Sequence, residues 1–172
     1  HRDLHSFPTR RSSDLWCQNH LTVTGATPEF RAWLADGFSF QRMNQVPPAD
    51  PHHDCAIHSW RNLDTYCNAW GTKCDLDDME QRQVSSELLE TGSSFFDTAW
   101  SPPMQAIEAM SRQFPEVSFQ LDYCELGMFF AGTATFQDGE CHDDCHEEKS
   151  AVMKIACDLF GYEDEEDCEL VS

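Results

Sequence analysis

The sequence predicts an α+β fold in which helices cover one face of an antiparallel sheet. Apolar and polar residues alternate over 117–124, which is typical of a strand with one buried face. Apolar residues recur at helical spacing over 104–114, which indicates a helix that buries one stripe. Stretches of these two kinds follow one another along the chain without an internal repeat. A sheet that buries one face against such stripes is the expected outcome.

The first fifteen residues, HRDLHSFPTRRSSDL, back-translate to a common short-read sequencing adapter. A chance match over this length is negligible. We therefore interpret residues 1–15 as a translated adapter and expect the native sequence to begin at about Trp16. Such a segment does not bear on the fold, and its arginines do not indicate an N-terminal arm that binds nucleic acid. We expect one domain over residues 16–162, followed by an acidic flexible tail over 163–172.

The first predicted elements are a short strand and a helix. Residues 20–24 alternate between apolar and polar side chains and predict the strand. Thr27 is a favourable N-cap and Pro28 suits the first helical position, so a helix is expected to begin there. Gly37 is expected to end this helix. A connection that contains three prolines follows over 38–53.

The middle of the chain gives a mixed pattern. Residues 54–71 carry an apolar stripe at helical spacing and predict a helix. From Thr72 to about Glu80 the pattern is short and polar but alternates, which favours a strand. Residues 80–90 are ambiguous, because they could be helical in isolation. Apolar side chains alternate again over 93–100 and predict a strand.

The remaining elements have the clearest signals. Ser-Pro-Pro opens the helix predicted over 104–114. The strand predicted over 117–124 is followed by another over 128–137, and Asp138–Gly139 is a tight-turn signal. Apolar spacing over 152–160 indicates an extra C-terminal helix. The central order of strand, helix, two strands, helix and strand is that of the ferredoxin-like βαββαβ arrangement.

Composition excludes several classes of function. The net charge is −20, and it becomes −21 without the three Arg and two Asp of residues 1–15. Such a chain repels nucleic-acid phosphates and anionic membranes, so we expect neither as a partner. The expected partners are a basic protein surface, metal ions or nothing charged at all. No apolar run approaches the ~20 residues of a membrane span. Nine Cys without regular spacing predict a cytosolic protein with mostly reduced, buried thiols.

Four strings carry a resemblance to a known family: WCQNHLTVTG at 16–25, AWGTKCD at 69–75, FDTAWSPP at 96–103, and FPEVSFQLDYCELGMFFAGTATFQDGE at 114–140. Together they resemble the YubB-like proteins of phages and plasmids, over most of residues 16–140. Cys74 stands where that family usually has a second Trp. The resemblance implies a ferredoxin-like domain that acts in the cytoplasm of a bacterial host of a mobile element. It supplies no catalytic residues, because the family has no established activity.

Two of these strings contain a candidate surface site. In one interpretation, Lys73 and Asp97 form a charge pair between stacking walls made by Trp70 and Trp100. In the other interpretation the two Trp residues pack the sheet against the helices. Gly71 then permits a turn, and the Ser-Pro-Pro sequence begins a helix. Because capping already explains the Ser and Pro residues, the structural interpretation is favoured.

A second candidate is a zinc site in which Cys141, Cys145 and either His142 or His146 supply three ligands and Cys55 or His58 supplies the fourth. Cys and His three to four residues apart can meet around one zinc ion. A strong zinc signature has two well-spaced pairs, and the second pair here is irregular. The alternative interpretation is a polar, acidic loop before the last helix, with no cofactor.

The sequence contains no nucleophile elbow, phosphate-binding loop or dinucleotide-binding motif. An enzyme is therefore not favoured. We expect a small, acidic, non-enzymatic accessory protein of a phage, plasmid or other mobile element that works by protein–protein contact. One alternative is a DNA-mimicking decoy that occupies the groove of a basic host defence protein. Another is a zinc- or thiol-dependent activity at residues 141–146.

Overall fold

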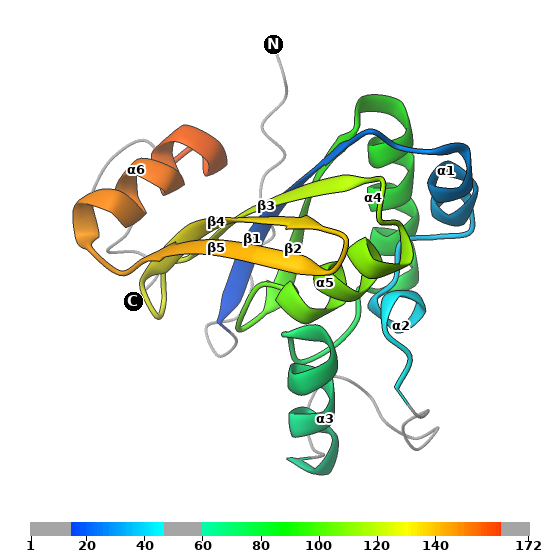
Figure 1. Ribbon diagram of the computed structural model, residues 1–172. Coiled ribbons are helices and arrows are strands. Elements are labelled where there is room, and N and C mark those ends of the chain that lie inside the picture. Colours follow the sequence, from blue (N-terminus) through cyan, green and yellow to red (C-terminus); the bar gives the residue numbers. More distant parts are fainter. Residues whose placement is uncertain (1–14, 47–59, 163–172) are drawn as a thin grey trace.

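The structure is a computed structural model that describes residues 15–46 and 60–162 (Figure 1). Three predictions concern residues outside these ranges. They are residues 1–14 of the segment interpreted as an adapter, the ligand candidates Cys55 and His58, and the acidic tail at 163–172.

A five-stranded antiparallel sheet forms the centre of the fold, with the strand order β2-β1-β3-β4-β5. Its two edge strands among the described residues are therefore β2 and β5. The strands are β1 Trp16–Thr24, β2 Ser93–Ala99, β3 Ser118–Glu125, β4 Phe130–Gln137 and β5 Glu140–His146.

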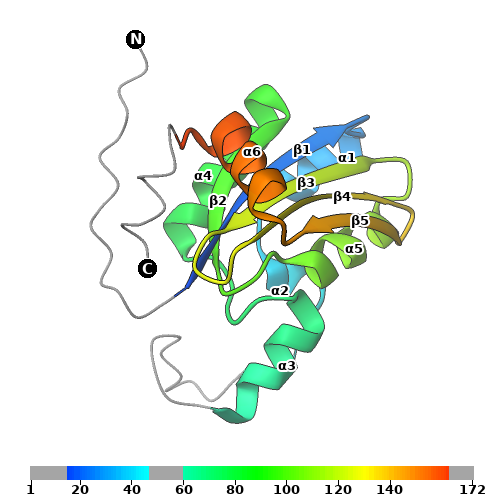
Figure 2. The ribbon, with the colours of Figure 1, turned by 90° about the vertical axis from the view of Figure 1, so that its left-hand side faces the viewer.

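The helices lie on both sides of this sheet, as two views at right angles show (Figures 1 and 2). They are α1 Pro28–Ala35, α2 Phe40–Met43, α3 Trp60–Trp70, α4 Asp78–Thr91, α5 Met104–Gln113 and α6 Lys149–Phe160. The main core contains residues of α1, α2, α4 and α5. We call the sheet face that they cover the helical face. The other face, on which α6 packs, is called the second face.

The main core follows from strict alternation along the strands. Leu21 on β1 and Phe119 and Leu121 on β3 are buried among the helices, as is Val117 just before β3. Met110 of α5 lies in the same cluster. Side chains of successive strand residues point to opposite faces, so one apolar set fills this core. The predicted α+β class, with its antiparallel sheet and C-terminal helix, is confirmed.

A smaller cluster holds α6 on the second face. Val152 and Ala156 of α6 pack there with Cys124 of β3 and Ala131 of β4. The hydroxyl of Tyr162, just after α6, donates to Gln18 Oε1 of β1 at 2.9 Å. The expectation that helices cover one face alone is therefore corrected, because α6 covers part of the second face.

The strand predicted from Thr72 to Glu80 is wrong. Residues 71–77 form bends and irregular backbone, and α4 begins at Asp78. The Asp77 side chain accepts from the Met79 and Glu80 amides, and the Glu80 carboxylate accepts from the Asp77 amide, which completes a capping box. The apparent alternation therefore came from capping residues, and the ambiguous stretch over 80–90 is helical.

Two further expectations are corrected. Residues 140–146 form the strand β5, not a loop, because the turn at Asp138–Gly139 brings them against β4. A short helix, α2, lies within the connection expected over 38–53. Both elements depend on partners distant in the sequence, which local pattern does not reveal.

The cysteines that the structure describes form no disulfide. The expectation of mostly buried thiols is wrong for this part of the chain. Cys17 and Cys124 are buried, whereas Cys141, Cys145 and Cys157 are exposed. Within residues 15–46 and 60–162, no helix combines the length and the apolar character that a membrane crossing requires.

Candidate functional site

One row of side chains crosses all five strands on the second face. Cross-strand pairing joins Phe95, His20, Asp122, Thr133 and Asp144 in that order, from β2 to β5. Directly opposed side chains in a sheet lie about 4.5–5.5 Å apart, so the five form a continuous row. The row begins at an aromatic ring on one edge of the sheet and ends at a carboxylate on the other.

Asp122 is the buried centre of this row. The Thr133 hydroxyl donates to its carboxylate at 2.7 Å, and the Gln120 side-chain amide donates at 3.2 Å. His20 Nδ1 lies 3.5 Å from Asp122 Oδ2, and this nitrogen has no hydrogen-bond partner within the described part of the chain. The His20 ring stacks on Phe95 with 4.2 Å between ring centroids. Packing therefore fixes the imidazole ring beside a carboxylate that neutral donors hold in place.

The edge strand β5 lies at the acidic end of the row. All its residues except the last are exposed. Tyr123, on the helical face of β3, donates its hydroxyl to Asp143 at 2.7 Å. Alternation then assigns Cys141, Asp143 and Cys145 to the helical side, and His142, Asp144 and His146 to the second face. Each side of this edge thus presents a carboxylate.

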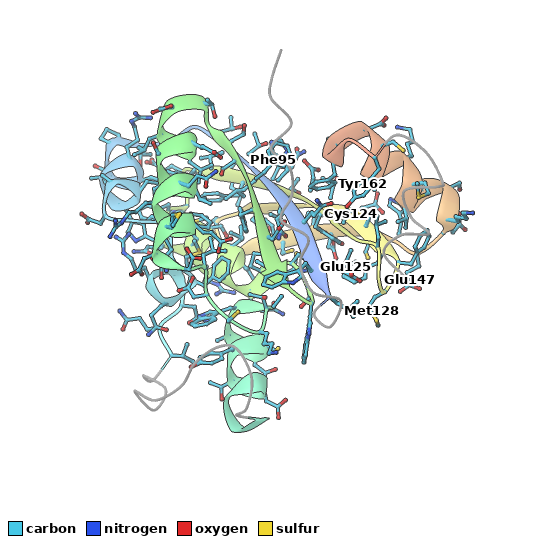
Figure 3. All side chains as sticks on the ribbon, turned by 180° about the vertical axis from the view of Figure 1, so that it is seen from behind. Phe95, Cys124, Glu125, Met128, Glu147 and Tyr162 are labelled. Carbon is cyan, nitrogen blue, oxygen red and sulfur yellow. The ribbon has the colours of Figure 1, made fainter. Side chains whose placement is uncertain are left out.

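Figure 3 shows the molecule from behind, with side chains of both faces drawn. Phe95 and Tyr162 lie toward one end of this view, and Glu125, Met128 and Glu147 lie toward the other. Glu125 is buried and accepts hydrogen bonds from the Gly127 and Met128 amides, so its carboxylate closes the β3–β4 turn. Its role is structural.

Residues 69–170 match the family described as the ferredoxin-like domain in Api92-like protein. The chain belongs to this family. Comparison with curated proteins and with solved structures gave no match. The family match supports the ferredoxin-like fold, whereas the resemblance to YubB-like proteins stays a prediction.

The matched region of this Api92-like family member begins at Ala69 and includes the strands from β2 to β5 and α6. The strand β1 precedes the matched region, although it lies between β2 and β3 in the sheet. His20 therefore joins the row from outside the region by which the family is identified.

The structure separates the members of the first candidate site. Trp70 is buried, stacks on Tyr66 and donates from Nε1 to the Asn44 carbonyl at 2.8 Å. Trp100 is exposed, and Lys73 Nζ lies 4.9 Å from its ring centroid. The structure thus gives Trp70 a packing role and brings Lys73 and Trp100 together at the surface.

Asp97 is the fourth member of that candidate site. It pairs with Gln18 of β1 in the sheet register, on the second face. Trp70 therefore lies in the core, Lys73 and Trp100 meet at the surface, and Asp97 lies on the second face of β2. The charge pair between Lys73 and Asp97 stays a prediction.

Hydrogen bonds tie the two motifs to each other. Thr72 Oγ1 donates to the Ala99 carbonyl at 2.8 Å, and Ser101 Oγ donates to the Gly71 carbonyl at 2.5 Å. The Asn19 side-chain amide donates to Thr98 Oγ1 at 2.8 Å. A Cβ on Gly71 would lie 2.8 Å from the Met104 amide nitrogen, which leaves room only for glycine. The two motifs, at 69–75 and 96–103, therefore stabilise the junction of α3, β2 and α5.

The predicted zinc ligands lie on both sides of one strand. The alternation of β5 directs Cys141 and Cys145 away from His142 and His146. In the described part of the chain, no group of three or more Cys, His, Asp or Glu side chains could hold a metal ion. Because Cys55 and His58 lie outside this part, the complete ligand set stays a prediction.

A thiol-dependent activity at β5 has weak support. Although Cys141 is exposed, neighbouring atoms partly desolvate its thiol, and this raises its pKa above the ordinary value, with a further increase from the carboxylates of Asp143 and Glu108. The thiolate is the nucleophilic form of cysteine, and a raised pKa makes it scarcer at neutral pH. Cys141 is therefore a poor candidate for a catalytic nucleophile.

Sequence reasoning missed His20 and Asp122 as members of one row. Alternation places both on the polar side of their strands, which the sequence shows. The register that sets His20 opposite Asp122 depends on strands about a hundred residues apart. That register could not be read from either strand alone.

Proposed function

We propose that the chain is a non-enzymatic accessory protein of a phage, plasmid or other mobile element that binds a basic surface of another protein. The edge strand β5, with the acidic half of the sheet behind it, is the proposed contact. The mobile-element setting rests on the resemblance to YubB-like proteins alone.

The charge distribution of the sheet carries this proposal. The segment from Phe114 to Glu148, which contains β3, β4 and β5, has no Lys or Arg. It contains nine acidic residues: Glu116, Asp122, Glu125, Asp138, Glu140, Asp143, Asp144, Glu147 and Glu148. A surface of one sign attracts partners of the other sign and accelerates their association.

The position of β5 adds a second means of contact. In the described sheet it pairs with β4 alone, so its outer edge faces away from the other strands. Edge strands present backbone donors and acceptors to which another chain can add a strand. Charged side chains on an edge strand also prevent self-association, which is an alternative explanation of the charges on β5.

Affinity capture with charge-reversal variants tests the proposal. Glu140 and Asp144 are exposed on β5, so the double variant E140K/D144K should fold and lose partners that bind through this edge. Asp64 on α3 and Glu90 on α4 are also exposed, and D64K/E90K changes the net charge equally. Each variant is used to capture proteins from a bacterial lysate at low and at high salt, and the recovered proteins are quantified.

We expect wild type and D64K/E90K to recover the same basic proteins at low salt, and E140K/D144K to lose most of them. High salt should weaken recovery in every case, because screening shortens the Debye length to roughly 3 Å at 1 M. Equal recovery by the two double variants would show that β5 is not the contact. Displacement of the captured protein by duplex DNA would favour the decoy form of the proposal.

A further inference from the structure

A groove of about 550 Å³ runs along the other edge of the sheet, between β2, α4 and α6. Its apolar lining includes Val84 of α4, Phe95 of β2, and Leu159 and Phe160 of α6. Pockets of this size hold ligands in many proteins. The hydrogen bond from Tyr162 to Gln18 fixes the end of α6, so this wall of the groove is held in position.

Phe95 is the most prominent apolar group of this groove. Its side chain is 52% exposed, although it stacks on His20 and lies edge-to-face with Phe160 at 6.1 Å between ring centroids. A large aromatic ring held between two others, yet open to solvent, has apolar surface available for a partner.

The register of β2 directs backbone groups of Phe95 into the groove. Val23 donates to the Gly92 carbonyl and Trp100 donates to the Leu15 carbonyl, each at 2.8 Å. In an antiparallel pair the hydrogen-bonded positions alternate, so even-numbered residues of β2 bond to β1 and odd-numbered residues point outward. Outward bonds at both ends of β2 agree with this, since the Thr91 hydroxyl donates to the Ser93 carbonyl and the Thr72 hydroxyl donates to the Ala99 carbonyl.

The charges of the groove are of one sign. Glu80 of α4 and Asp97 of β2 are its charged lining residues, and both are acidic. Residues 163–172 of the chain follow directly after α6, but six of them are acidic: Glu163, Asp164, Glu165, Glu166, Asp167 and Glu169. Like charges across a contact oppose binding. The groove is therefore suited to a basic segment of a partner and not to the acidic residues 163–172 of this chain.

We propose that an extended segment of a partner protein, with alternating apolar and basic residues, adds as a strand to β2 in this groove. Its apolar side chains contact Phe95 and Phe160, and its basic side chains face Glu80 and Asp97. This site shares no residue with β5, so it does not rest on the function proposed above.

A short peptide of alternating lysine and valine is the probe for this site. Its binding to the full chain is measured by fluorescence anisotropy at about 0.15 M salt, where distant charges are largely screened. Amide hydrogen exchange of the chain is measured with and without peptide. F95K places a cation in the groove, and M128K makes the same change at a side chain that is 67% exposed in the β3–β4 turn (Figure 3).

We expect F95K to weaken binding by about tenfold or more and M128K by less than about twofold, because Phe95 lines the groove and Met128 does not. A peptide that is N-methylated at the amides expected to bond to β2 should bind the wild-type chain as weakly as the unmodified peptide binds F95K. Bound peptide should slow amide exchange at Phe95. Equal weakening by F95K and M128K, or protection confined to β5, would overturn the proposal.

The chain's own C-terminal segment is the competing occupant. A chain that ends at Tyr162 is compared with the full chain. We expect the same peptide affinity and the same exchange rate at Phe95 in both. If the peptide binds only the shortened chain, and Phe95 is already protected in the full one, the segment occupies the groove and the proposal fails. E140K/D144K should keep peptide binding, which separates this outcome from failure at β5.

Discussion

Cys17 is a thiol with no exposed surface on β1, which lies between β2 and β3 in the sheet. Burial raises its pKa well above the ordinary 9.0, with further increases from Cys124, Glu125 and Asp97. The folded chain therefore keeps this proton at a pH where the unfolded chain loses it. The stability that the protonated Cys17 thiol contributes is fully present below pH 9. Above pH 9 the free energy of unfolding falls by up to about 1.4 kcal/mol per pH unit on account of this group.

Replacement by alanine should remove this pH dependence. C17A is expected to be less stable than wild type at pH 7, because it leaves a cavity, but to lose less stability between pH 9 and higher pH. Urea unfolding measured from pH 7 to above pH 9 gives both the stability at pH 7 and the loss of stability at higher pH. V117A leaves a cavity at another fully buried position without removing a titrating group, so it should keep the wild-type slope. Parallel slopes in C17A and wild type would contradict the assignment.

Single residues also show where sequence reasoning reaches its limit. Capping by the Ser-Pro-Pro sequence was enough to favour a packing role for Trp70, which is buried in the structure. Local pattern was not enough for Asp75, whose carboxylate accepts from the Ser39 hydroxyl at 2.7 Å and from the Phe40 and Gln41 amides at 2.8 and 3.0 Å. These partners are more than thirty residues away, so no local pattern identifies them.

At the scale of elements, Asp75 supplies the cap that α2 lacks. The N-cap residue Ser39 makes no side-chain capping bond of its own, and the Asp75 carboxylate takes its place. Hydrogen bonds to charged groups contribute about 1.5–3 kcal/mol. We expect D75A to lower the free energy of unfolding by at least about 2 kcal/mol, measured by urea unfolding.

The matched control lies two residues away. Asp77 caps α4 with two bonds that are exposed to solvent, so D77A should cost only about 1 kcal/mol. The two variants differ in whether the carboxylate joins distant segments or closes one helix. Equal losses would mean that the link between Asp75 and α2 contributes little.

The elements that were predicted well are those with a one-sided burial pattern. The predicted strand over 117–124 and helix over 104–114 agree with β3 and α5 to within a residue or two. β5 has no buried side, so its sequence shows no alternation of apolar and polar residues. Its strand character comes from pairing with β4, which is a property of the sheet and not of the segment.

At the scale of the whole molecule, the two edges of the sheet have different chemistry. The β5 edge is exposed and acidic, whereas the β2 edge lies in an apolar groove between α4 and α6. α6 contributes to this difference, because it packs on the second face and leaves the outer edge of β5 open. A chain with two such edges could hold two partner segments at opposite ends of one rigid sheet.

The high net charge should weaken the folded state as a whole. A charge of −20 produces repulsion within the compact chain, and salt screens it. We expect the free energy of unfolding to rise by about 1 kcal/mol or more between low and moderate salt. The measurement is urea unfolding at several sodium chloride concentrations.

The charge variants locate this repulsion. E140K/D144K introduces cations into a segment that has none, so it should raise stability at low salt and flatten the salt dependence. D64K/E90K makes the same change in net charge on helices, farther from the β3–β5 carboxylates. Because a substitution in a strand also alters strand propensity, the salt slope is the decisive value and not the absolute stability. If both variants flatten the salt dependence of the free energy of unfolding equally, the repulsion depends on the total charge of the chain. The carboxylates of β3, β4 and β5 then repel one another no more than those of the rest of the chain do.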